Sequence, residues 1–286
     1  NQRSGWRWNS SKAFLKPAKQ RSNLTVWTEA QVEKLTFDRD ATGALRCTGA
    51  RVDRGGQTLT VSARHETLLS AGAINSPKIL QLSGIGPAAL LKSQGIEVLR
   101  DAPVGENLQD HLQIRAVYKV KGTRTLNTLA ANLWGKAMIG AEYMLKRSGP
   151  MSMSPSQLGA FTRSDPGRTH ANLEYHVQPL SLEAFGQPLH NFPAITASVC
   201  NLRPESRGRI EITTNDPMAA PRIAPNYLSV EADRQVAARA IRLTRQVMAA
   251  EPLTKYRPEE FRPGPEYQSD EDLMRAAGDV GTTIFH

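Results

Sequence analysis

The residues from Gly72 to Gly86, GAINSPKILQLSGIG, are the segment whose residue types and spacing point most directly to chemistry. Small residues at Ala71 and Gly72 allow another group to approach the backbone closely where a predicted strand ends. Ser76 and Pro77 are typical of a helix N-cap followed by the first helical position, and the amides of a first helical turn can bind an anion. The segment is therefore either a cradle for a polar or phosphate-bearing ligand or simply a tight strand-to-helix turn.

Histidines are the other candidates for chemistry. The imidazole pKa lies near neutrality, so a histidine can exchange a proton with a substrate hydroxyl. His111 follows Asp110 in the string NLQDH, which is compatible either with a covering loop to which His111 contributes or with a structural hydrogen bond between Asp110 and the backbone. The remaining histidines are isolated and are predicted to be ordinary core or surface residues: His65, His170, His176 and His190.

The two cysteines, Cys47 and Cys200, lie far apart in the sequence and form neither a CxxC pair nor a Cys/His ligand spacing. This spacing predicts no zinc site and no disulfide. Each lies in a strand-like run, so we expect both thiols to be buried.

The composition is that of an ordinary globular protein, because 40% of the 286 residues are apolar and 22% are charged. A net charge of +9 is compatible with an anionic partner, but the basic residues are scattered, so no nucleic-acid partner is predicted. No run of about 18 apolar residues and no apolar signal core occur. The sequence favours a cytoplasmic protein without a transmembrane segment, a membrane-associated protein being the alternative.

Hydrophobic periodicity predicts a mixed fold of the α/β (α+β) class with antiparallel sheets. Strands are expected in 24–37, 45–53, 57–72 with its last strand at 66–70, within 106–120, in 158–163, 171–180 and 194–202, and within 208–217. Helices are expected from Ser76, from Pro87 to Gly95, over 126–147 and over 231–250.

The string from Gly72 to Gly86 resembles the second signature of the glucose-methanol-choline (GMC) oxidoreductases, and each fixed position of that signature is filled. Other family landmarks follow in their usual order: NLTVWTEAQV, PVGENLQDHLQ, RPESRGRIEI and GTTIFH. The chain is similar to the choline-dehydrogenase-like and FAD alcohol dehydrogenase members. The family's GxGxxG turn does not occur in the sequence. We therefore expect an internal fragment that begins after that turn.

The resemblance implies FAD as the cofactor and assigns roles to particular residues. Val32 would meet the adenosine part of the flavin, and the cofactor-binding turn would comprise Ala71, Gly72, Asn75 and Ser76. His286 would be the catalytic base. Gln157 would contact substrate at a position where choline-directed relatives carry a glutamate, so its neutral side chain favours an uncharged alcohol over choline.

The resemblance implies that residues 1–118 belong to the FAD-binding domain and residues 119–286 to the substrate domain. The implied reaction oxidises a primary alcohol to an aldehyde by hydride transfer to flavin N5, with a quinone, a carrier or dioxygen as the later electron acceptor. Two alternatives remain open: a truncated, non-catalytic fragment, and a hydroxynitrile-lyase-like member of the same fold.

Overall fold

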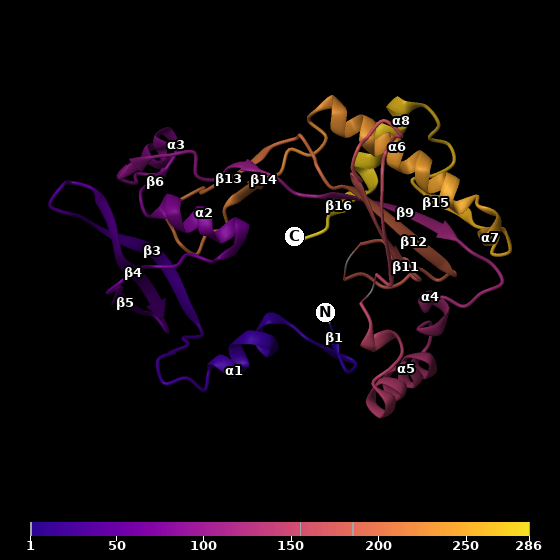
Figure 1. The fold of residues 1–286 in the computed structure, drawn as a ribbon, viewed down its shortest axis with the longest axis horizontal. Coiled ribbons are helices and arrows are strands. Elements are labelled where there is room, and N and C mark those ends of the chain that lie inside the picture. Colours follow the sequence, from indigo (N-terminus) through magenta and orange to yellow (C-terminus); the bar gives the residue numbers. More distant parts are fainter. Residues whose placement is uncertain (1, 155, 185, 286) are drawn as a thin grey trace. The chain divides into compact units, whose positions relative to one another are not determined.

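The computed structural model describes residues 2–154, 156–184 and 186–285, and these form two compact units (Figure 1). The small unit comprises Ser22–Gln109 and Arg207–Asn226. The large unit comprises the residues up to Arg21, Asp110–Ser206 and the residues from Tyr227 onward. The fold is mixed α/β with antiparallel sheets, as predicted.

The small unit contains an antiparallel meander of β3 (Ala30–Arg39), β4 (Leu45–Arg54) and β5 (Gln57–Ser62). The first turn is closed by Asp40, whose carboxylate accepts the Thr42 and Ala44 amides at 2.8 and 3.0 Å. The second turn is Gly55-Gly56, where φ is +62° and +80°, the left-handed conformation of a tight hairpin. The antiparallel pairing agrees with the prediction, but β3 begins at Ala30, six residues after the predicted start at Leu24.

The strand predicted over 66–70 is wrong. β5 ends at Ser62, and the described chain contains no strand between that residue and Gly72. Thr67 and Leu69 are half-buried while Leu68 is 80% exposed, so the apolar alternation is real. An extended segment becomes a strand only when a neighbour supplies the hydrogen-bond ladder, and no described strand pairs with this segment.

The helix α2 (Gly72–Leu82) begins four residues before the position that the sequence predicts. Ser76 is therefore not its N-cap, and Pro77 lies inside the helix. Gly72 has φ +85°, a conformation that lets the chain turn into the helix at this earlier residue. The following helix α3 (Ala88–Ser93) agrees with its prediction, and Gly95 beyond it has φ +68°.

Gln81 joins α2 to a second sheet of the small unit and is fully buried. Its side-chain amide donates to the Val104 and Ile210 carbonyls at 2.8 and 2.9 Å, and its carbonyl accepts the Ile212 amide at 2.9 Å. This sheet has the order β14-β13-β8. Its strands are β8 (Glu106–Leu108), β13 (Gly208–Glu211) and β14 (Arg222–Ala224), and a short parallel pair comprises β6 (Ile85–Gly86) and β7 (Arg100–Asp101).

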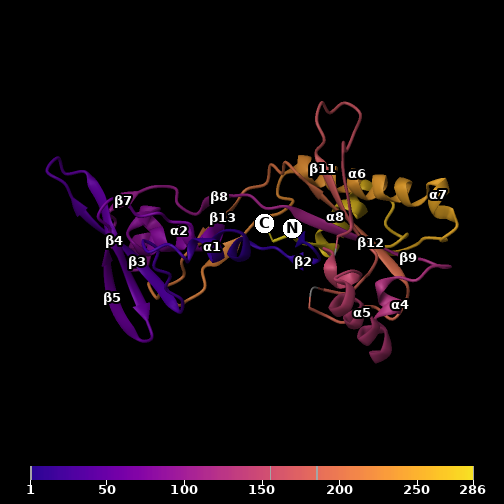
Figure 2. The same ribbon diagram turned by 60° about the horizontal axis from the view of Figure 1, so that its bottom comes forward.

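The large unit is built on a six-stranded antiparallel sheet in which β15 and β16 both pair with β9. Its strands are β9 (Leu112–Lys119), β10 (Leu158–Thr162), β11 (Leu173–Gln178), β12 (Ala194–Asn201), β15 (Glu259–Arg262) and β16 (Gly281–Thr283). The helices α6 (Glu231–Met248) and α8 (Asp270–Val280) cover one face of this sheet (Figure 2). Ile114, Leu173 and Val199 pack against these helices.

The predicted helix over 126–147 is two helices, α4 (Leu126–Leu129) and α5 (Leu133–Lys146). Asn132 starts the second helix, because its side chain accepts the Gly135 amide at 2.8 Å. The remaining short elements are β1 (Gln2–Arg3), β2 (Trp6–Arg7), the π-helical turn Ser11–Leu15, α1 (Lys16–Ala18), the 3₁₀ turn Pro150–Ser152 and α7 (Glu251–Thr254). None of the described helices is long and apolar enough to span a bilayer.

Candidate active site

Four of the five predicted cofactor residues lie together where the chain enters α2. Ala71, Gly72 and Asn75 are exposed, and the Ala71 amide donates to the Ser76 hydroxyl at 3.1 Å. A Cβ at Gly72 would meet no atom within 4 Å, so the backbone is open to a ligand there. The exposed first turn of an eleven-residue helix carries partial positive charge, which suits a phosphate or another polar group of a flavin nucleotide.

Val32, the fifth predicted cofactor residue, lies on β3 of the same unit. It is half-buried and pairs with Val52 across the meander. The strand β3 packs against the other end of α2, where the Leu35 amide donates to the Ser83 hydroxyl at 2.8 Å. These five residues are thus compatible with a dinucleotide cofactor. Four of them lie in the turn at the start of α2, and the fifth lies on the strand β3.

Gln157, the predicted substrate residue, lies in the large unit beside an apolar cavity of about 550 Å³. Its backbone amide donates to the Val177 carbonyl at 3.0 Å, which extends the pairing of β10 with β11. Leu158 also lines the cavity, and the described lining residues include no carboxylate. At the cavity wall the Tyr175 hydroxyl bonds to Thr244 at 2.9 Å, and burial raises the pKa of Tyr175.

His286, the predicted catalytic base, lies outside the described residues. The strand that leads to it, β16, is described and is held in two ways. Gly281, Thr282 and Thr283 pair with β9, and the Thr283 hydroxyl donates to the Asp110 carboxylate at 2.6 Å.

Asp110 is a residue whose role the sequence did not reveal. Besides the Thr283 hydroxyl, its carboxylate accepts the Tyr227 hydroxyl, so it joins two side chains more than a hundred residues away. Burial and the hydrogen bond to Asp110 raise the pKa of Tyr227 to about 12. In the sequence, the only indication of a structural role for Asp110 is its place beside His111 in the string NLQDH. Its neighbour His111 is bonded through Nε2 to the Leu202 carbonyl at 3.2 Å.

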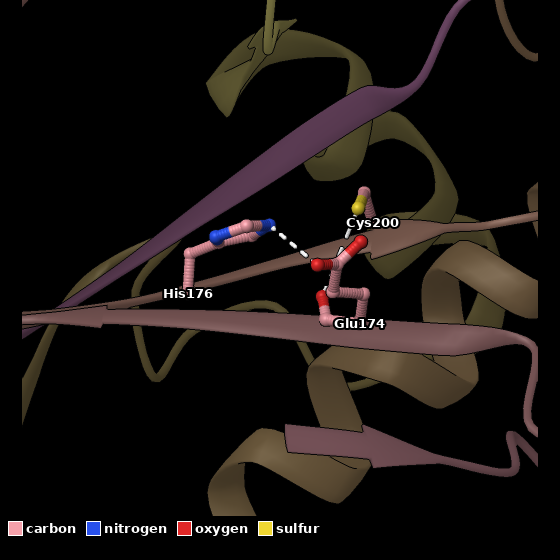
Figure 3. A group of neighbouring side chains, drawn as sticks. All are labelled: Glu174, His176 and Cys200. Atoms are coloured by element: carbon pink, nitrogen blue, oxygen red, sulfur yellow. Dashed lines mark hydrogen bonds and ion pairs between the residues drawn. The ribbon is translucent and has the colours of Figure 1, made fainter. Parts of the chain in front are cut away.

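A second group of potential ligands comes together on β11 and β12: Glu174, His176 and Cys200 (Figure 3). Sequence spacing predicted no metal site, and it could not reveal this group, because the register of the two strands places Cys200 opposite Glu174. Cys200 is buried as predicted. Cys47 is only half-buried, because it lies on the open meander of the small unit.

Comparison with known proteins supports the assignment suggested by the signature. Two family models, both described as GMC oxidoreductase, match residues 1–113 and 204–286. The oxygen-dependent choline dehydrogenase of Chromohalobacter salexigens is 38% identical over 99% of this chain and 50% of its own length. The enzyme of the same name from Photobacterium profundum is 39% identical over 94% of the chain and 46% of its own length. The chain thus spans about half the length of the curated relatives it matches.

Among solved structures, a formate oxidase from Aspergillus oryzae superposes with a TM-score of 0.85 at 22% identity. The superposition covers all of this chain and 53% of the formate oxidase chain, and it establishes a shared fold. The chain belongs to the GMC oxidoreductase family, whose members are FAD-dependent.

Proposed function

We propose that this chain belongs to an FAD-dependent alcohol oxidoreductase that converts a primary alcohol to an aldehyde. The match of both family models carries the proposal, and the open α2 turn at Gly72 supports it. In this proposal residues 1–118 contribute to the FAD domain and residues 119–286 to the substrate domain. FAD, when bound, supplies the acceptor for the hydride that the alcohol carbon loses.

The residues of the chain would hold the cofactor and move the proton. Ala71, Gly72, Asn75 and Ser76 would hold a polar part of the flavin nucleotide at the start of α2, and Val32 would contact its adenosine part. His286 would accept the hydroxyl proton as the alcohol carbon gives up its hydride, so that the products are an aldehyde and a reduced acceptor. The Asp110–Thr283 hydrogen bond would fix the strand that presents His286.

The test uses the complete reading frame that encodes this chain, purified and assayed with a redox dye. We expect a flavin absorbance band at roughly 450 nm. We also expect that the dye is reduced only when a primary alcohol is present. The variant His286→Asn should lower kcat by roughly 10²–10⁴, the usual contribution of a general base. His170→Asn, a change at an exposed histidine, is the matched control. A protein without flavin, or full activity in His286→Asn, would refute the proposal.

Two substrate classes can be distinguished in the same assay. The names of the relatives favour choline, whereas the cavity beside Gln157 lacks a carboxylate among its described residues and favours an uncharged alcohol. We propose the uncharged alcohol, because the described lining offers a quaternary ammonium aromatic rings but no carboxylate to neutralise its charge. The variant Gln157→Glu should raise kcat/KM for choline about tenfold relative to benzyl alcohol, equivalent to ~1.4 kcal/mol. A wild-type preference for choline would overturn this choice.

A further inference from the structure

Three side chains with metal-binding atoms project from the same side of two neighbouring strands in the large unit (Figure 3). Glu174 and His176 are two residues apart on β11, so both point to one face of the sheet. Cys200 on β12 lies directly opposite Glu174 in the register. The carboxylate oxygen, imidazole nitrogen and thiol sulfur all lie within 4.8 Å of one another.

Two buried polar atoms in this group lack a hydrogen-bond partner among the described residues. His176 Nε2 is 3.3 Å from the Glu174 carboxylate, but the contact does not have hydrogen-bond geometry. Ser198, opposite His176 in the register, is fully buried, and its hydroxyl has no hydrogen-bond partner among the described residues. Buried polar atoms are nearly always bonded to protein, water or an ion, so these two neighbouring atoms are expected to contact a water or an ion.

We propose that Glu174, His176 and Cys200 bind one zinc ion, or another thiol-seeking divalent cation. Thiolate, imidazole and carboxylate are the three ligand types that zinc takes from proteins, and three of them leave one tetrahedral position to water. The Ser198 hydroxyl is available to bond that water. Zinc–ligand bonds of about 2.0–2.3 Å imply that the donor atoms lie roughly 3.3–3.7 Å from one another. The donor atoms, which are within 4.8 Å of one another, therefore have to move by about an ångström through side-chain rotation.

Charge and proton balance are consistent with a cation in this partly buried place. Burial, with the neighbouring Glu174 carboxylate, raises the pKa of Cys200 to about 12, which opposes loss of the thiol proton and has to be offset by the bond to the metal. Binding breaks the S–H bond, forms the S–metal bond and releases one proton to solvent. The cation then faces one thiolate, one carboxylate and a neutral imidazole, which makes the occupied site neutral.

Arg115 is the opposing feature. It lies on β9 opposite Ser198, on the same face of the sheet, and brings a positive charge toward the site. Arg262 acts on Arg115 as a second positive charge, and Glu183 offsets part of the charge of this pair.

The test titrates Zn²⁺ into the complete, untagged protein that contains this chain by calorimetry and follows Co²⁺ by its near-ultraviolet thiolate band. We expect one metal ion per chain and a Co²⁺ spectrum with a thiolate ligand. Cys200→Ser and Glu174→Gln should each weaken binding by at least about 100-fold, the upper end of the loss seen when even a supporting residue is removed. Cys47→Ser is the matched control, since it changes the chain's other cysteine on β4 of the small unit.

The Glu174→Gln variant keeps the test decisive if the buried Cys200 change impairs folding, because Glu174 is partly exposed. Circular dichroism of each variant confirms that it is folded. Absence of stoichiometric binding by the wild type overturns the proposal. So does wild-type affinity in either folded variant, or an equal loss in Cys47→Ser.

Discussion

The hydrogen bond between Thr283 and Asp110 gives the most direct test of how the chain holds the segment before His286. The variant Thr283→Val keeps the β-branched shape and removes the hydroxyl. It deletes the 2.6 Å bond to the carboxylate and also the 3.0 Å bond that the hydroxyl accepts from the Phe285 amide. A hydrogen bond to a charged group contributes roughly 1.5–3 kcal/mol and an exposed neutral one less, so we expect a loss of about 2 kcal/mol.

Hydrogen–deuterium exchange is the appropriate assay, because two compact units need not unfold together. Peptides covering residues 279–285 should exchange about thirtyfold faster in Thr283→Val, while peptides from the small unit serve as the internal reference. Thr282→Val, a change at the next residue of the same strand, is the control and should change stability by no more than about 0.5 kcal/mol.

A double-mutant cycle with Asp110→Asn then isolates the pair. A coupling energy of at least about 1 kcal/mol is expected for two groups in direct contact. Equal effects of Thr282→Val and Thr283→Val, or additive effects of Thr283→Val and Asp110→Asn, would show that Asp110 does not anchor β16.

Three further predictions follow from the structure. Gln81→Met should destabilise the small unit by about 3 kcal/mol, since it leaves three buried backbone groups without their partner, whereas Gln57→Met at an exposed position should be nearly neutral in urea unfolding. The raised pKa of Tyr227 means that its contribution to stability is complete below about pH 10 and disappears as pH rises through about 12; the loss of stability over this range should be smaller in Tyr227→Phe. Gly72→Val should lower flavin affinity of the complete protein about tenfold, measured by flavin content, while Gly43→Val, with a similar positive φ in the β3–β4 turn, should not.

The fold could be predicted where the pattern along the chain determines structure locally. The meander turns at Asp40 and Gly55-Gly56 and the amphipathic helix α6 follow from residue type and periodicity. The start of α2 could not be predicted in this way, because Ser-Pro is compatible with both an N-cap and a helix interior. The positive φ at Gly72 decides between them.

The candidate site was predictable only as far as it depends on contiguous residues. The string from Ala71 to Ser76 folds into one turn, so its residues were found together. The tertiary fold brings Asp110 together with Tyr227 and Thr283. No spacing in the sequence reveals that these three side chains meet. The interpretation of Gln157 rests on a family position, and the structure adds that this residue lies beside an apolar cavity.

The position of the proposed metal ligands is determined by the packing on the opposite face of the same sheet. On β11, Leu173 and Tyr175 are buried against α6 and α8, and the alternation of a strand then requires Glu174 and His176 to point the other way. A one-residue slip of β11 would expose these core side chains and bury a carboxylate under the helices, which costs far more than the site could return. The register that places Cys200 opposite Glu174 is therefore enforced by the core. For this reason the three donors should stay together without metal, and Glu174→Gln should remove binding without unfolding the sheet.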